Sequence, residues 1–201
     1  MLEFATIPNL HQHLTEAWHD PAASATQDPA EDSLSALITA QHRENFDLWH
    51  EEDKARDPHA TDADIAQVKR AIDRLNQRRN DLVEKIDEWL LADLPQNPAA
   101  PLNSETPGLI IDRLSILALR IYHTRIEAHR ESASEAHRLR NASRLTLLED
   151  QRNDLAGCLD ALLAAIRNGS RRFKLYRQMK MYNDPDLNPL VYAHKPIHKP
   201  S

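Results

Sequence analysis

The longest regular pattern of apolar and polar positions runs from Thr61 to Leu91 and predicts one continuous helix. Apolar residues recur there at steps of three and four, as on the inner face of a bundled helix: Ile65, Val68, Ile72, Leu75, Leu82, Ile86 and Trp89. About 100° around the helix lies a second, polar face: Lys69, Asp73, Asn76, Asn80, Glu84 and Asp87. A face of this kind is either solvated or turned toward another helix, and the pattern leaves both alternatives open.

The same reasoning predicts three further long helices and a short one. Residues 8–19 form the short helix, and the first long helix spans 29–56 with Asp28 as its N-cap. Two more long helices follow a proline-containing loop, and the last ends near Asn168, where Gly169 acts as a left-handed cap. The other predicted helix starts are Thr61 with Asp64, Thr106 with Pro107, and Ser132 with Glu135.

Composition narrows the fold class and the chemistry. Only three glycines occur in 201 residues, which excludes a Walker loop and a dinucleotide fingerprint, since both need clustered glycines. No stretch alternates apolar and polar residues with the period of a strand, so the class predicted is all-α. Cys158 is the only cysteine; it excludes an intrachain disulfide and is expected to be a buried, inert thiol.

Charge is distributed unevenly along the chain. The net charge is −6, but residues 161–201 carry eight Lys or Arg and two Asp, a local excess of positive charge. The acidic remainder argues against nucleic-acid binding by the body of the protein. The start of the chain lacks a signal-peptide pattern, and no apolar run of about 18 residues occurs. We therefore expect a cytoplasmic protein without a membrane span.

A short sequence recurs 73 residues along the chain. Arg79-Asn80-Asp81-Leu82 reappears as Arg152-Asn153-Asp154-Leu155, and Trp49-His50 matches Tyr122-His123 at the same offset. The repeat favours two similar helical hairpins related by a pseudo-twofold axis, with chance similarity between amphipathic helices as the alternative. We predict an antiparallel bundle of four long helices built from two such hairpins, plus a basic C-terminal helix. The predicted domains are a variable segment and linker (1–32), the bundle (33–168) and the basic tail (169–201).

Several motifs resemble a bacterial family called domain of unknown function 4254. They are His42-x-x-Asn45-x-x-x-Trp49-x-x-Glu52-Asp53-x-Ala55-Arg56, Lys69-x-x-x-Asp73-x-x-Asn76-Gln77-x-Arg79-Asn80-Asp81, Thr106-Pro107-Gly108, Asp112-Arg113-Leu114-Ser115-Ile116 and Lys180-Met181-Tyr182-Asn183-Asp184-Pro185. The resemblance covers about residues 33–190. Members of this family are often encoded near glycosyltransferases. The resemblance therefore implies an association with surface glycans and no particular mechanism.

The best candidates for chemistry share one face of the first long helix. His42, Asn45, Glu52 and Arg56 recur at helical spacing, and this face is either a ligand site or a structural ion-pair network. Because histidine titrates near neutrality, His42 with Glu52 or Asp53 is the predicted acid–base group. The predicted ligand-binding residues are Asn45, Arg56, Lys69, Asp73, Asn76, Asn80, Asp112, Arg113, Arg171, Arg172 and Arg177.

The basic tail has three interpretations: a solvated helix, an anion clamp that closes over the acidic body, or an RNA contact. We expect no cofactor and no metal, because the only Glu-x-x-His pair, Glu16 to His19, lies in the variable front segment.

Two functions remain open from the sequence. The first is a polar inter-helix pocket for an anionic, phosphorylated sugar-type metabolite, with a transferase or hydrolase role left undecided. The second is a non-catalytic adaptor that docks on a glycan-assembly enzyme.

Overall fold

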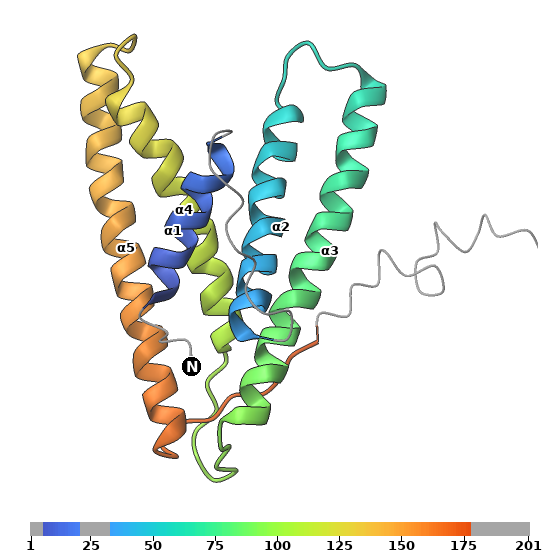
Figure 1. Cartoon of the computed structure of the whole chain (residues 1–201), viewed down its shortest axis with the longest axis vertical. Helices are drawn as coiled ribbons and strands as arrows, with labels where there is room; N and C mark the ends of the chain where they lie inside the picture. Colours follow the sequence, from blue (N-terminus) through green and yellow to red (C-terminus); the bar gives the residue numbers. More distant parts are fainter. Residues whose placement is uncertain (1–5, 21–32, 178–201) are drawn as a thin grey trace, which may run out of the picture.

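The computed structural model describes residues 6–20 and 33–177. These ranges contain five α-helices, and their only extended pairing is one isolated bridge (Figure 1). The helices are α1 (Ile7–His19), α2 (Leu34–Lys54), α3 (Asp62–Asp93), α4 (Pro107–His129) and α5 (Glu135–Arg167). The predicted all-α class is confirmed.

The long helices pair as two antiparallel hairpins, α2 with α3 and α4 with α5. α2 and α4 lie side by side between α3 and α5 (Figure 1). They run in the same direction: His42 contacts Ser115, and two turns later Trp49 contacts His123. The antiparallel order therefore holds within each hairpin, whereas the two hairpins meet through a parallel helix pair.

All five helices contribute to one core at the lower end of the molecule in Figure 1, and the two hairpins diverge above it. Burying an aliphatic side chain there stabilises the fold by about 1.5–3 kcal/mol. The buried cluster comprises Ile7, Leu34, Ile38, Ile86, Leu90, Leu94, Ile110, Ile111, Leu114, Leu159, Leu162, Leu163, Ile166 and Phe173.

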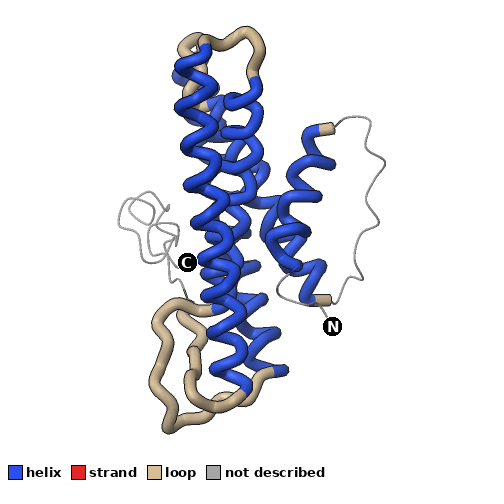
Figure 2. The backbone as a smooth tube through the Cα atoms, turned by 90° about the vertical axis from the view of Figure 1, so that its left-hand side faces the viewer, coloured by secondary structure: helices blue, strands red, loops and turns tan. Residues whose placement is uncertain are grey.

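α1 lies on one face of the layer formed by the four long helices (Figure 2). It contacts α4 and α2 and buries Ile7, His11, Leu14 and Thr15. Although α1 belongs to the segment predicted to vary, its buried side chains make it part of the packed structure.

The predicted caps are partly observed. Thr61 and Asp64 form the capping box of α3, and the Thr106 side chain accepts a hydrogen bond from the backbone of Leu109. The predicted cap Ser132 is wrong: Ser134 is the N-cap of α5 and accepts from His137. α2 begins at Leu34 with Ser33 as its cap, not at residue 29, and Asp28 lies outside the described residues.

The predicted basic C-terminal helix is wrong for the described residues up to Arg177. Gly169 has a φ of 73° and ends α5 as predicted, but the chain then continues extended. Arg172 forms the isolated bridge with Leu102, and the backbone of Asn103 donates to the Arg172 carbonyl at 2.8 Å. This path buries Phe173 in the core, a gain of apolar burial that outweighs helix propensity. Residues 178–201 lie outside the described part of the chain.

Candidate functional site

His42 lies in a buried polar cluster where α1, α2 and α4 meet. Its Nε2 atom is 2.9 Å from Thr15 Oγ1, and its Nδ1 atom is 2.7 Å from Ser115 Oγ. Thr15 itself donates to the carbonyl of His11 at 2.8 Å. A neutral imidazole with its proton on Nε2 satisfies all these bonds, because Thr15 then accepts and Ser115 donates. Burial lowers the pKa of His42 to about 3, which keeps the ring neutral.

The cluster continues to Asp112 through side-chain amides. Asn45 Nδ2 donates to Ser115 Oγ and to Asp112 Oδ1, both at 2.9 Å, and Gln41 donates to the same carboxylate oxygen at 2.6 Å. Burial raises the pKa of Asp112, while the positive charge of Arg79 and the bond from Asn45 oppose that rise. These bonds link polar side chains of three helices and fix the relative register of α2 and α4, while both ring nitrogens of His11 and the Oε1 atom of Gln41 have no hydrogen-bond partner in the described structure.

A cavity of about 480 Å³, here called the central cavity, opens beside this cluster between α2, α3 and α4. Its size is typical of small-molecule sites. It is lined by Asn45, Leu48, Trp49, Glu52, Asp53, Arg56, Asn76, Arg79, Ile116, Leu119 and Arg120.

Charges are arranged unevenly along the central cavity. Arg56 forms ion pairs with Glu52 at 3.1 Å and with Asp53 at 3.6 Å, so the two carboxylates at this end outnumber the cation between them. At the other end, Arg79 Nε lies 3.9 Å from Asp112, too far for a hydrogen bond. This buried nitrogen has no hydrogen-bond partner in the described structure.

Arg120 and Trp49 complete the walls. Arg120 is exposed and forms no ion pair with any described residue. The Trp49 ring stacks on His123 with centroids 4.5 Å apart and an interplanar angle of 4°. Burial lowers the pKa of His123 to about 4, so Trp49 rests on a neutral ring. The cavity therefore joins an aromatic wall, a cationic end and a carboxylate-rich end.

The structure brings five predicted residues together on this cavity: Asn45, Glu52, Asp53, Arg56 and Asn76. Two others lie behind its wall. His42 is fully buried and does not line the cavity, and Asp112 contacts the lining residues Asn45 and Arg79 without lining the cavity itself. The predicted acid–base partnership of His42 with Glu52 or Asp53 is therefore not formed in this geometry.

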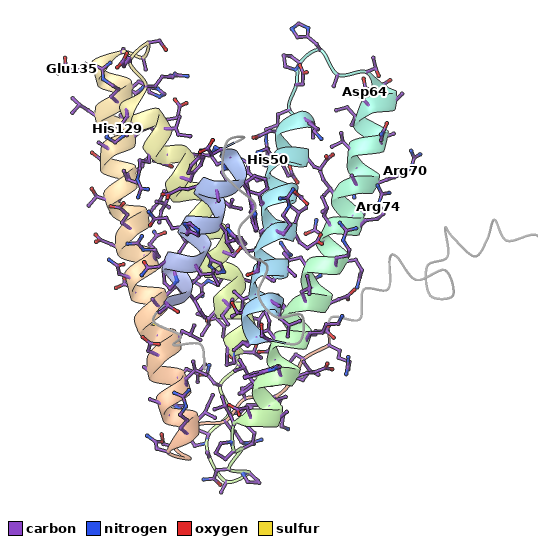
Figure 3. All side chains as sticks on the ribbon, in the orientation of Figure 1. His50, Asp64, Arg70, Arg74, His129 and Glu135 are labelled. Carbon is purple, nitrogen blue, oxygen red and sulfur yellow. The ribbon has the colours of Figure 1, made fainter. Side chains whose placement is uncertain are left out.

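Other predicted ligand-binding residues do not line the central cavity. Lys69 and Asp73 form an ion pair within α3, in the part of that helix beyond the core, where Figure 3 places Asp64, Arg70 and Arg74. Asn80 is buried, with Oδ1 3.4 Å from Arg79 Nη2. The predicted polar face therefore splits into an exposed ion pair at Lys69 and Asp73, a cavity-lining position at Asn76 and a buried position at Asn80.

The remaining basic candidates are engaged elsewhere. Arg113 pairs with Glu105 at 2.7 Å, and Arg172 donates to the Ala100 carbonyl at 2.8 Å. Arg177 pairs with Glu84 at 3.3 Å and Glu88 at 2.8 Å on α3, while Arg171 is exposed. The described part of the tail packs on the α3 end of the body and contributes nothing to the central cavity.

Sequence reasoning missed Arg79, Arg120 and Trp49 as site residues. Trp49 and Arg79 both belong to the internal repeat, Trp49 as the counterpart of Tyr122 and Arg79 as the first residue of Arg-Asn-Asp-Leu. Cys158, expected to be buried, is exposed. The sequence feature that points to these residues is the repeat with its offset of 73. It relates residues of the cavity wall to residues of the other hairpin that α1 covers.

α1 covers the surface that corresponds to the central cavity in the other hairpin. Asn45, Leu48, Trp49, Glu52 and Arg79 have counterparts 73 positions later in Ala118, Ile121, Tyr122, Arg125 and Arg152. All five counterparts line a small pocket together with the α1 residues Pro8, Gln12, Thr15 and Glu16. The described structure contains no second helix of this kind over the α2–α3 hairpin, and the central cavity is open at the corresponding place.

The described residues include no group of three or more His, Cys, Asp or Glu arranged to hold a metal ion. None of the helices described is both long and apolar enough to cross a membrane.

These features define an all-helical protein of two hairpins, joined through a parallel helix pair, with an open polar cavity beside that pair. The chain belongs to the family described as protein of unknown function, DUF4254, which matches residues 35–175. The predicted resemblance is confirmed, and α1 precedes the matched range. No curated protein and no solved structure matches the chain.

Proposed function

We propose that the protein binds an anionic, phosphorylated sugar-type metabolite in the central cavity. The observation that carries this proposal is the pair of arginines at one end of the cavity. Arg79 has a buried Nε without an acceptor, and Arg120 lacks an ion-pair partner among the described residues. A buried donor without a partner costs about 1–3 kcal/mol, and a phosphate oxygen removes that cost.

The rest of the wall fits the sugar part of such a ligand. Both amide hydrogens of Asn45 are used by Ser115 and Asp112, so its carbonyl oxygen is the atom left to accept from a hydroxyl. Asn76 and Glu52 supply further polar groups, and Trp49 offers an aromatic surface for the apolar face of a sugar ring. Cations at one end and carboxylates at the other complement a phosphate joined to a polyhydroxyl group.

Binding, rather than catalysis by His42, is the role that this geometry supports. The neutral, buried imidazole is fully bonded within the fold, and Glu52 and Asp53 are tied to Arg56. The link to surface-glycan metabolism rests on the family association alone, and a cytoplasmic location fits a phosphorylated metabolite. Both are parts of the proposal.

The test is titration calorimetry with the 1-phosphates of glucose, galactose, mannose and N-acetylglucosamine. We expect at least one to bind, and Arg79→Gln or Arg120→Gln to weaken it about tenfold or more, as loss of a charge-assisted hydrogen bond does. Arg70→Gln is the matched control: Arg70 is exposed on α3 and does not line the central cavity, and the substitution removes the same charge (Figure 3). Failure of all four ligands, or an equal loss in the control, would refute the proposal.

The adaptor alternative is favoured by a different observation. Leu139 and Leu147 on α5 are each 61% exposed, and Ile126 on α4 is 48% exposed. Apolar side chains that are this exposed on the α4–α5 hairpin suit a contact with another protein. If that contact is the function, Leu139→Glu with Leu147→Glu would abolish association with a purified glycan-assembly enzyme while leaving sugar-phosphate binding unchanged.

A further inference from the structure

A second cavity of about 420 Å³, here called the α4–α5 cavity, adjoins the central cavity. It lies between α4 and α5 and is lined by Arg113, Ile116, Leu117, Arg120, Gln151, Asp154, Leu155 and Cys158. Nothing in the proposed function uses it.

The two cavities share a wall. Ile116 and Arg120 line both, and they lie one turn apart on the same face of α4. α1 covers the opposite face of α4, where Ala118 and Tyr122 contact it. A ligand that extends past Arg120 therefore passes from one cavity to the other along a single face of one helix.

The other hairpin provides an internal comparison for the α4–α5 cavity. In the α2–α3 hairpin, Glu44 and Arg78 form an ion pair at 2.9 Å between the two helices. The residues 73 positions later are Leu117 and Gln151, which cannot form one. At this pair of positions an ion pair in one hairpin is thus replaced by two uncharged side chains in the other, while α4 and α5 are bridged elsewhere by Arg125 and Glu149.

The position of Arg120 strengthens this contrast. Its counterpart 73 positions earlier is Asp47, which pairs with Arg43 at 3.0 Å, whereas the counterpart of Arg43 is Ile116. An ion pair in one hairpin is therefore replaced by an apolar residue and an unpaired cation in the other. That cation lies on the wall shared by the two cavities.

We propose that the protein's ligand is a phosphate-linked conjugate of two groups, with the sugar in the central cavity and an uncharged, hydrogen-bonding group in the α4–α5 cavity. The phosphate linkage then lies at Arg120. This inference rests on the proposed function and names its ligand class more closely. Leu117 and Leu155 suit a flat apolar surface of the second group, and Gln151 and Asp154 accept hydrogen bonds from its hydroxyl or amide donors.

Affinity provides the first test. Each sugar 1-phosphate is compared by calorimetry with its uridine and guanosine diphosphate conjugates and with the free nucleoside monophosphates. In a conjugate, the sugar and the nucleoside are linked, so once one of them is bound the other binds its cavity intramolecularly. A conjugate should therefore bind about 100-fold tighter than either part alone.

The single cysteine provides a second readout without any substitution. Cys158 is exposed and lines the α4–α5 cavity, so its reaction with Ellman's reagent reports occupation of that cavity. We expect the conjugate to slow this reaction about tenfold or more at saturation, as exclusion from an occupied site does, and a sugar 1-phosphate to leave its rate unchanged.

A matched pair of variants completes the design. Cys158→Trp fills the α4–α5 cavity and should remove the advantage of the conjugate while sparing sugar 1-phosphate binding. Lys85, at the exposed position 73 residues earlier, lines neither of these two cavities, so Lys85→Trp should change neither affinity. If a sugar 1-phosphate binds and no conjugate gains affinity or protects Cys158, this inference is refuted and the proposed function stands. If no sugar 1-phosphate and no conjugate binds, both fail.

Discussion

The Nδ1 atom of His42 lies 2.7 Å from the Oγ atom of Ser115, and the two residues are 73 positions apart. That separation equals the offset of the internal sequence repeat. His50 and His123, also 73 apart, contact each other along the same helix pair with ring centroids 6.3 Å apart. Contacts between residues at a constant offset are what a pseudo-twofold axis parallel to α2 and α4 produces. The correspondence of residues 42–90 with 115–163 stays a prediction: when the two segments are superposed, both helices of each hairpin should align.

Ser115 contributes two hydrogen bonds to the buried polar cluster. Removing its hydroxyl group should therefore lower the free energy of unfolding. Ser115→Ala leaves His42 Nδ1 and one amide hydrogen of Asn45 without a partner, a loss of about 1–3 kcal/mol in the free energy of unfolding. Urea denaturation measures it. The control is Ser143→Ala, an exposed helical serine bonded to the Leu139 carbonyl, which should change stability by less than about 0.5 kcal/mol. Equal effects of the two substitutions would contradict a structural role for the cluster.

Buried histidines should make the fold sensitive to acid. Burial lowers the pKa of His11, His42 and His123 below the value of the unfolded chain, so the folded state holds these rings neutral. Their contribution to stability is complete above pH 6.5 and falls as the pH drops toward about 4 for His123 and about 3 for His42. Each such group lowers the free energy of unfolding by about 1.4 kcal/mol per pH unit in this window.

A carboxyl group acts in the opposite direction in the same window. Burial raises the pKa of Asp87 to about 6, so protonation on acidification relieves its unfavourable burial. The separate effect of histidine is therefore measured as a difference: denaturation of the wild type and of His42→Gln at pH 7, 6, 5 and 4.5. The variant should lose stability less steeply between pH 6 and 4.5, and parallel curves would contradict the assignment.

Two glycines should respond in opposite ways to alanine. A Cβ atom at Gly108 would lie 2.8 Å from Asp87 Oδ1 and from the Val83 carbonyl oxygen, where the Gly108 amide already donates to Asp87 at 2.7 Å. Gly108→Ala should destabilise the protein by about 1–3 kcal/mol through this overpacking. A Cβ atom at Gly157 would meet no atom within 4 Å beyond the neighbouring backbone of its own helix, so Gly157→Ala should stabilise α5 by about 0.5–1 kcal/mol. Thermal unfolding of both variants checks the two signs.

Asp73 and Asn76 were predicted to share one ligand-binding face, and the structure separates them. Asp73 pairs with Lys69 near the exposed part of α3, whereas Asn76 lines the central cavity. Asp73→Ala should cost about 0.3–0.5 kcal/mol, as a surface pair one turn apart does, and should not change ligand affinity. Asn76→Ala should weaken sugar 1-phosphate binding measurably at similar stability. The opposite outcome would place the ligand along the outer part of α3.

The sequence by itself determined the helices and much of their capping. The spacing of apolar residues and the local bonds at Thr61, Thr106 and Gly169 depend on neighbours within a few positions, so they can be read without the fold. The exceptions have a physical reason. Ser132 and Ser134 carry the same chemistry, and only the path of the turn decides which of them caps α5. The tail leaves the helical conformation because Phe173 gains a place in the core, a long-range contact that no local pattern shows.

The tertiary structure alone decided which polar residues form a site. His42, Asn45 and Glu52 share a face of α2, yet α1 covers His42, Asn45 reaches the cavity and Glu52 lies near solvent. A helical period gives the direction of a side chain but not what covers it, and here the cover comes from a helix outside the family match. The central cavity likewise exists because α1 has no counterpart over the α2–α3 hairpin in the described structure. Burial is a property of packing between distant segments, and the sequence pattern fixes only which side chains are available for it.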